Sequence, residues 1–289
     1  MITTVGKLFY QNGKPLIKMW NSTVENKSRP FVRHYHSYFE ITLVLSGSGE
    51  YTTEKEVYPM NPGDVFVFAS NEVHYITEIY DDNLSLLILQ FEPRFLENID
   101  YSSLKESFLT FCFFHSPDFK NRIPGSDSGL IRDKLIAIKQ EFENEDAYNH
   151  IAIRSHLNMI LIDLLRNHNY RCPDVNKSEN VRSLLKVYDY IDAHLSEELT
   201  LEAISKIAML SPNYFSHFFK HMNGISLWDY INAKRVEKAE KIITSSQEKY
   251  TMLQVATMCG FNNTVNFNKA FKKQKGIAPS ELRKLQKQP

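Results

Sequence analysis

The sequence is poor in cysteine, carries no net charge and has no long apolar run. Its three cysteines, Cys112, Cys172 and Cys259, are too far apart for a disulfide framework or a metal-binding motif. No run reaches the ~18 apolar residues that a membrane-spanning helix needs, and the N-terminus lacks the apolar segment of a secretion signal. Phosphate-binding glycine loops, nucleophile elbows and paired-carboxylate motifs are missing too. These absences favour a cytoplasmic protein without a membrane segment and argue against an enzyme.

The zero net charge hides an uneven distribution. Residues 1–176 contain 17 Lys and Arg against 23 Asp and Glu, whereas residues 177–289 contain 17 against 11. From Ser211 onward the count is 13 against 5, a net charge of +8. A basic part on a neutral chain suggests one module that contacts an acidic polymer and one that does not. A solvated basic face is the alternative that charge alone leaves open.

The first part of the chain predicts a β-rich domain followed by helices. Residues 31–92 contain short apolar runs separated by turn sequences such as Asn61-Pro62-Gly63-Asp64, which is typical of a sandwich or barrel. Residues 130–168 change to a helical period, with an apolar stripe from Ile153 to Leu165. We expect this stripe to pack on the barrel, to pair with a second subunit, or to do both.

The predicted fold class is α+β with two domains, as the length of 289 residues suggests. The polar, pattern-free stretch 171–180 is interpreted as a linker. The apolar pattern after it predicts helices only. The expected organisation is therefore a domain over 1–170, the linker over 171–180, and an all-α domain over 181–289.

The helical part contains an internal repeat. Phe219-Lys220 and, three residues later, Gly224-Ile225 recur with an offset of 52 as Phe271-Lys272 and Gly276-Ile277. Upstream of the predicted turn the offset is 51, so the second turn is one residue longer. Each copy predicts a short helix, a tight turn and a second helix, which is the helix-turn-helix arrangement. The second helix of such a unit can enter the major groove of DNA.

The two second helices carry side chains suited to DNA. The first, over 211–222, is expected to bury Phe215, Phe218 and Phe219, and the second, over 263–275, to bury Phe267 and Phe271. Asparagine can bond adenine edges, lysine suits guanine or phosphate, and valine can contact a thymine methyl. A helix predicted over 227–245 would span about 28 Å, close to the ~34 Å between successive major grooves. The candidate DNA-binding residues are Asn213, Ser216, His217, Lys220, Thr264, Val265, Asn266, Lys269 and Lys272.

Residues 200–284 resemble the AraC/XylS family of bacterial transcription regulators. The resemblance rests on Ala256, Gly260-Phe261, Phe267, Ala270-Phe271-Lys272-Lys273, Gly276, Pro279 and Arg283. It implies that bases are contacted by Asn213, Ser216 and His217 from the first helix and by Thr264, Val265, Asn266 and Lys269 from the second. The sequence departs from the family at Ser205, usually Ala, at Met209, often Gly, and at Asn266, often aromatic. These departures leave the predicted fold unchanged and the DNA sequence open.

The N-terminal part contains a histidine pattern. His34, His36 and Glu40 would project on one face of an extended strand with Tyr38 between them, and His74 follows at a later strand end. The pattern is similar to the motifs of the cupin barrels, although the second motif lacks Pro-x-Gly and has Glu78 in place of Asn. The similarity implies a cupin-like barrel.

Three roles are open for these residues. They could bind a divalent metal ion, they could line a pocket for a small polar molecule, or they could be core residues without a ligand. AraC-type regulators commonly use such a barrel to bind a sugar or related effector without a metal, which favours the pocket. The predicted ligand-binding residues are His34, His36, Tyr38, Glu40 and His74, with no metal and no cofactor.

The resulting hypothesis is a cytoplasmic transcription regulator that binds double-stranded DNA. A small-molecule effector, expected to be a carbohydrate, would bind in the barrel, and two recognition helices would enter adjacent major grooves. The resemblance implies an activator that forms a homodimer and contacts RNA polymerase. Two alternatives are a metal-dependent cupin enzyme with a helical appendage and a regulator that binds DNA without an effector.

Overall fold

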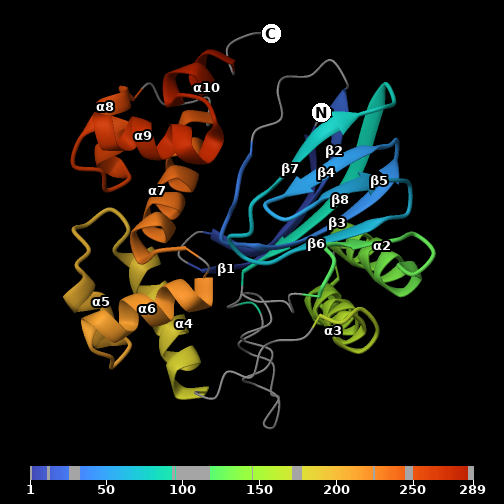
Figure 1. Ribbon diagram of the computed structural model, residues 1–289, viewed down its shortest axis with the longest axis horizontal. Coiled ribbons are helices and arrows are strands. Elements are labelled where there is room, and N and C mark those ends of the chain that lie inside the picture. The colour runs from blue at the N-terminus through green and yellow to red at the C-terminus, as the bar shows by residue number, and fades with distance from the viewer. Residues whose placement is uncertain are drawn as a thin grey trace. The chain divides into compact units, whose positions relative to one another are not determined.

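The computed structural model of the protein contains a sheet-rich unit and a helical unit (Figure 1). The first contains Met1–Phe31 and Tyr38–Asn176, and the second contains Val32–Ser37 and Lys177–Pro289. No helix among the described residues is long and apolar enough to cross a bilayer. The predicted two-domain α+β class is confirmed. The structure describes residues 2–11, 14–25, 33–92, 95, 118–144, 146–170, 178–223, 225–244 and 250–285.

A six-stranded antiparallel sheet forms the larger layer of the first unit, in the order β1-β2-β8-β3-β6-β9. The two N-terminal strands lie outside the region that the sequence predicted as β. They belong to the sheet because β2 pairs with β8 from Ile17 opposite Phe91 to Glu25 opposite Asn83. The strands are β1 (Ile2–Gln11), β2 (Lys14–Glu25), β3 (Phe39–Ser46), β6 (Val65–Phe68), β8 (Asn83–Phe91) and β9 (Arg122–Ile123).

A three-stranded sheet faces one side of the larger sheet. It consists of β5 (Val57–Met60), β4 (Gly49–Thr53) and β7 (His74–Ile79), in that order. Buried side chains from both sheets form one apolar cluster between them. At its centre the ring of Tyr51 lies 5.0 Å from that of Phe66 and 4.9 Å from that of Phe68. Aromatic packing therefore fills the part of this interior around Tyr51.

Two helices cover the opposite face of the six-stranded sheet, α2 (Gly129–Glu143) and α3 (Asn149–Asn167) (Figure 1). Strand β3 is consequently buried on both sides: Phe39, Ile41 and Leu43 pack with the helices, while the alternate residues face the three-stranded sheet. Burial on both faces explains the apolar character of β3. The predicted apolar stripe of α3 packs on the sheet, with Ile153, Leu157, Ile160 and Leu164 fully buried.

The second unit is helical in all its described elements. Helix α4 includes the last three residues of the stretch that the sequence assigned to a linker, and residues 171–177 lie outside the described residues. Helix α7 has 18 residues and therefore a length of about 27 Å. The helices are α4 (Ser178–Ala193), α5 (Leu201–Ile207), α6 (Pro212–Asn223), α7 (Leu227–Thr244), α8 (Met252–Met258), α9 (Thr264–Lys275) and α10 (Pro279–Leu285).

Local signals place the starts of these helices. A capping box begins α8, because Thr251 and Gln254 exchange side-chain and backbone hydrogen bonds. The Ser226 hydroxyl accepts a bond from the Asp229 N–H at 3.1 Å and donates one to the Asp229 carboxylate at 2.8 Å. The Asn263 side chain caps α9. Each cap satisfies a backbone N–H that the first turn of a helix leaves open.

Two helix-turn-helix units are present, α5–α6 and α8–α9. The aromatic residues that the repeat predicts as core, Phe215, Phe219, Phe267 and Phe271, are fully buried. Phe218 is an exception: it is only half-buried and stacks on Tyr214 with 6.3 Å between the ring centres. Its place on the helix, one residue before Phe219, turns it toward the edge of the core.

Candidate DNA-reading helices and effector site

Helix α6 presents the predicted DNA-reading residues of the first unit to solvent. Asn213, Ser216, His217 and Lys220 are all exposed, while the aromatic face of the helix is buried. Ser211 precedes the helix and accepts a hydrogen bond from the Tyr214 N–H at 3.4 Å. Tyr214 itself is partly exposed beside these polar residues. The sequence analysis did not include it, although its position next to Asn213 could have indicated it.

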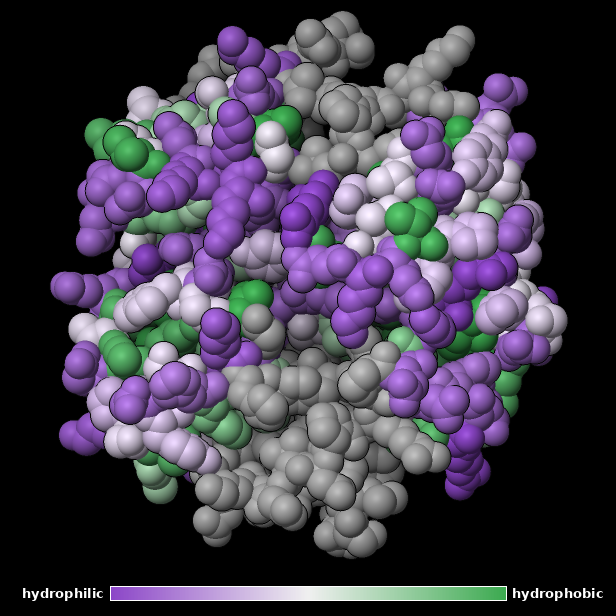
Figure 2. Space-filling view, in the orientation of Figure 1, coloured by the Kyte–Doolittle hydropathy of each residue, from purple (hydrophilic) through white to green (hydrophobic). Residues whose placement is uncertain are grey.

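Helix α9 presents the corresponding residues of the second unit. Val265 is 73% exposed, and Asn266, Lys269 and Lys272 are exposed, whereas Thr264 is half-buried. On the face drawn in Figure 2, hydrophilic side chains cover most of the surface over α8 and α9. Val265 is therefore accessible, and its contact with a thymine methyl stays a prediction.

Not every lysine of α9 is equally available to a partner. The Lys273 ammonium donates to the Asp229 carboxylate of α7 at 2.6 Å. This hydrogen bond raises the pKa of Lys273. Burial by itself would raise the pKa of the Asp229 carboxyl, but the hydrogen bonds from Lys273 and Ser226 lower that pKa overall. Lys269 and Lys272 are therefore the better candidates for contacts with phosphate or bases.

A buried polar network lies in the first unit. The Glu40 carboxylate, 3% exposed, accepts a hydrogen bond from the Thr42 hydroxyl at 2.8 Å and one from the Gln90 amide at 2.6 Å. The antiparallel register places Glu40 of β3 directly opposite Gln90 of β8. The sequence analysis missed both neighbours. Thr42 has the same strand parity as Glu40 and could have been found, whereas Gln90 requires knowledge of the register.

His74 extends this network at the start of β7. Its Nδ1 lies 2.8 Å from the Glu72 carbonyl oxygen, and its Nε2 lies 3.8 Å from a Glu40 carboxylate oxygen. The fully buried ring stacks on Phe68, with 4.1 Å between the ring centres. Burial lowers the pKa of His74, but the Glu40 carboxylate and the groups of Glu72 together outweigh burial and raise the pKa above its ordinary value.

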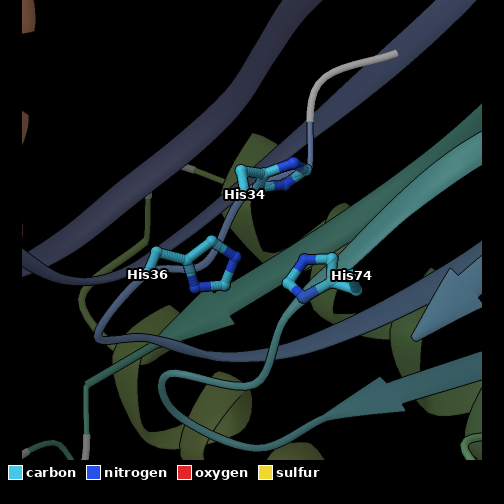
Figure 3. A group of neighbouring side chains, drawn as sticks. All are labelled: His34, His36 and His74. Atoms are coloured by element: carbon cyan, nitrogen blue, oxygen red, sulfur yellow. The ribbon is translucent and has the colours of Figure 1, made fainter. Parts of the chain in front are cut away.

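Figure 3 draws the three predicted histidines, with His34 and His36 in the segment before β3 and His74 at the start of β7. The sequence analysis placed His34 and His36 on a strand, but β3 begins only at Phe39 and both residues precede it. The prediction that His34 and His36 lie on this strand is therefore wrong.

Tyr38 has a different environment from the one expected. It is buried, and the Lys18 ammonium of β2 lies 4.0 Å from the centre of its ring. This cation–π contact ties the start of β3 to the N-terminal strands. The structure thus brings Glu40 and His74 together and places Tyr38 against β2.

Comparison with known protein families agrees with this division of the chain. A helix-turn-helix domain model matches residues 204–285, and an AraC-like ligand binding domain model matches residues 26–156. The chain belongs to the AraC family. It is accordingly an AraC-type DNA-binding transcriptional regulator with a ligand-binding domain.

Relatives within the AraC family match most of the chain. The probable transcriptional regulator LumQ of Photobacterium leiognathi is 24% identical over 264 residues, which cover 91% of this chain and 96% of LumQ. The HTH-type transcriptional activator RhaS of Escherichia fergusonii is 26% identical over 257 residues, covering 88% and 87% of the two chains. Both relatives are transcriptional regulators, and each match extends over both parts of this chain.

A solved structure shares the fold. ToxT from Vibrio cholerae superposes with a TM-score of 0.66 at 12% sequence identity, covering 93% of this chain and 98% of ToxT. At this identity the similarity shows the fold and no more. The AraC-family arrangement of a sheet-rich part followed by two helix-turn-helix units is therefore common to both proteins.

Proposed function

We propose that the protein is a transcriptional activator that reads two successive major grooves with α6 and α9. The observation that carries this proposal is the duplication: both helices follow a tight turn, both bury their aromatic face, and both expose polar residues. The intervening α7 is about 27 Å long, comparable with the ~34 Å between successive major grooves. Asn213, Ser216 and His217 would contact bases from α6, and Thr264, Val265, Asn266 and Lys269 from α9.

Lys220 and Lys272 would contact phosphates. Both are exposed near the C-terminal halves of their helices, and repeated Lys contacts to phosphate supply most of the affinity that does not depend on sequence. A DNA-selection experiment with the full chain tests the proposal. We expect a selected site with two conserved patches about 10 base pairs apart. A single conserved patch, unaffected by changes in one of the helices, would contradict the use of two grooves.

We also propose a polyhydroxy effector of the carbohydrate class in the sheet-rich unit. The Glu40 carboxylate, the Gln90 amide and the Thr42 hydroxyl form a donor and acceptor array in a buried site. Such arrays suit the hydroxyl groups of a sugar, because each hydroxyl donates and accepts. His34, His36 and Tyr38 would complete the ligand-contacting set around Glu40 and His74.

A second effector class follows from a structural relative. One solved structure is of ToxT bound to an unsaturated fatty acid. In this chain, however, a carboxylate at 3% exposure with two hydrogen-bond donors would repel an acyl chain and its acidic headgroup. The buried polar network therefore favours a sugar over a fatty acid.

Thermal unfolding of the full chain distinguishes these classes. A sugar at ~100 times its dissociation constant should stabilise the protein by about 2.7 kcal/mol, and E40Q should remove the shift. The exposed Glu78 of β7 provides the control variant E78Q, which should keep it. A shift with fatty acids alone would overturn the carbohydrate class. No shift with either would support the alternative of a regulator that needs no effector.

The remaining elements of the proposal concern partners. An activator contacts RNA polymerase, and the sign of control is supported by the name of RhaS, a transcriptional activator with 26% identity. A homodimer is supported by exposed apolar residues on α3, where Ile151 is 56% and Met159 is 44% exposed. A cytoplasmic location follows from DNA binding. The alternative of a metal-dependent cupin enzyme has no support from these relatives, which are regulators.

A further inference from the structure

A pocket of about 400 Å³ lies in the helical unit, lined by residues of α7, of α9 and of the turn before α9. The two helices share one apolar cluster, in which Val236 of α7 and Phe267 of α9 are fully buried. All the lining residues belong to the second unit, including Tyr35 of the segment Val32–Ser37. The volume lies in the range of small-molecule sites, about 300–1,000 Å³.

The side chain of Gln274 lines this pocket with an unsatisfied polar atom. Gln274 is 3% exposed, and its amide oxygen Oε1 accepts no hydrogen bond from any residue that the structure describes. Buried polar atoms nearly always have a partner, because an unmet acceptor has lost its contacts with water and gained nothing in return. A hydroxyl or N–H group of a molecule in the pocket can supply this partner, so the ligand should carry a hydrogen-bond donor.

The charged lining residues are mostly cationic. Lys269, Lys273 and Arg235 are positive and Asp229 is negative, so their net charge is +2. Lys273 already donates to Asp229 at 2.6 Å, whereas Lys269 is exposed. A phosphate monoester carries about −1.5 to −2 charges at pH 7, which balances this excess better than the single charge of a carboxylate.

We propose that this pocket binds a small phosphate monoester that also carries a hydroxyl or N–H donor. Lys269 contacts the phosphate, and the Gln274 oxygen accepts a hydrogen bond from the donor. Sugar phosphates and mononucleotides share this chemistry, and the experiment below separates them. The pocket contains none of the residues of the proposed carbohydrate site in the sheet-rich unit.

The pocket shares two residues with the proposed DNA-reading surface. Asn266 and Lys269 line it, and both are proposed to contact bases from α9. A bound phosphate monoester occupies Lys269 and adds negative charge beside this helix, so it should weaken DNA binding. This consequence rests on the proposed function, whereas binding of the small molecule itself does not.

Isothermal titration calorimetry of the full chain without DNA tests the site. The probes are glucose 6-phosphate and adenosine monophosphate, each compared with its unphosphorylated form, glucose or adenosine. We expect at least one phosphorylated probe to bind, with at least ten-fold weaker affinity in Q274M and in K269Q. Preference for one of the two probes assigns the pocket to sugar phosphates or to nucleotides.

The variants are chosen to keep the fold. Q274M retains the approximate volume of the side chain and removes the unsatisfied oxygen, so its melting temperature without ligand should be unchanged or higher. The matched control for K269Q is K206Q, because Lys206 is an exposed lysine of α5 outside the pocket and outside the proposed DNA contacts. K206Q should bind the probe like the original chain.

Three results would overturn the proposal. The first is no binding of either phosphorylated probe at millimolar concentration. The second is equal affinity for a probe and its unphosphorylated form, because the phosphate would then not be recognised. The third is binding that Q274M and K269Q leave unchanged and E40Q removes, which would place the probe in the sheet-rich unit.

The effect on DNA is measured separately, on a site obtained by selection. The bound probe should weaken DNA binding by the original chain more than DNA binding by Q274M. A chain that binds the probe but no DNA would contradict the proposed function and leave the pocket assigned. A chain that binds DNA but neither probe would contradict the pocket alone.

Discussion

The two helix-turn-helix units share a backbone but not the residue at the turn. Met209 in the first turn has a φ of 56° and Gly260 in the second has a φ of 88°, so both adopt the left-handed conformation. The repeat offset of 51 residues makes them equivalent. In the sequence, Met209 was a departure from the family, and the structure shows that the turn conformation is kept despite the side chain.

The difference lies in what surrounds each turn. The side chain of Met209 is 83% exposed and extends into solvent. A Cβ at Gly260 would lie 2.4 Å from the Leu195 carbonyl oxygen and 2.9 Å from Nε of Arg235. That oxygen already accepts a hydrogen bond from Arg235. The second turn thus requires glycine because a Cβ would collide with the backbone. In the first turn a methionine is tolerated, at the modest cost of a left-handed backbone conformation.

The largest effect that would test this comparison is expected for G260A. The substitution combines a left-handed alanine with a Cβ that contacts backbone, so we expect a loss of about 3 kcal/mol in the free energy of unfolding. The matched variant M209A should change it by less than about 0.5 kcal/mol, since its side chain is exposed. Urea denaturation measures both. Similar losses in the two variants would show that the turns are under the same constraint.

The equivalent asparagines give the next effect. N213A and N266A should each cost about 1–3 kcal/mol of binding at one base pair and relax the sequence preference there. Binding to a panel of operators with single base changes measures this. A uniform loss on every sequence would remove that asparagine from base readout.

Helix α9 has more lysines than α6, but two of them are already paired with carboxylates of α7. Helix α9 ends with Lys272, Lys273 and Lys275, but Lys275 bonds to Glu240 at 2.5 Å and Lys273 bonds to Asp229. Replacement of Lys220 or Lys272 by alanine should each lower the slope of log affinity against log salt by about 0.9. K273A, whose charge is already paired, should lower it less. Equal slopes for K272A and K273A would contradict this assignment.

The smallest effect is expected for M209G. Removing the Cβ relieves a left-handed strain of about 1–2 kcal/mol, while glycine adds about 0.5–1 kcal/mol of unfolded-state entropy. We therefore expect a gain of about 0.5 kcal/mol, seen as a small rise in melting temperature with unchanged DNA binding. A loss of stability would mean that the Met209 side chain makes a contact that matters.

The helical half was largely predictable because its signals are local. The phenylalanine spacing involves residues within a few turns of helix, and the structure buries these phenylalanines as expected, apart from Phe218. The sheet-rich half was less predictable. Strand β2 was missed because its partner β8 lies 58 to 74 residues away in the chain, and β1 was missed because it joins the sheet only through β2.

The candidate effector site shows the same limit. The sequence indicated His34, His36, Glu40 and His74 by their residue types and spacing. That prediction assumed that the first three share one face of a strand, whereas the strand begins only at Phe39. Gln90 and the Glu72 carbonyl, which position Glu40 and His74, carried no sequence signal.

The sequence by itself determined the family, the two-part organisation and the two recognition helices, because periodicity and capping are properties of neighbouring residues. Only the tertiary structure decided which lysines are already paired, why residue 260 must be glycine while residue 209 need not be, and which groups surround His74. These depend on strand register and on close approach between segments far apart in the chain, and neither is encoded in any short stretch of sequence.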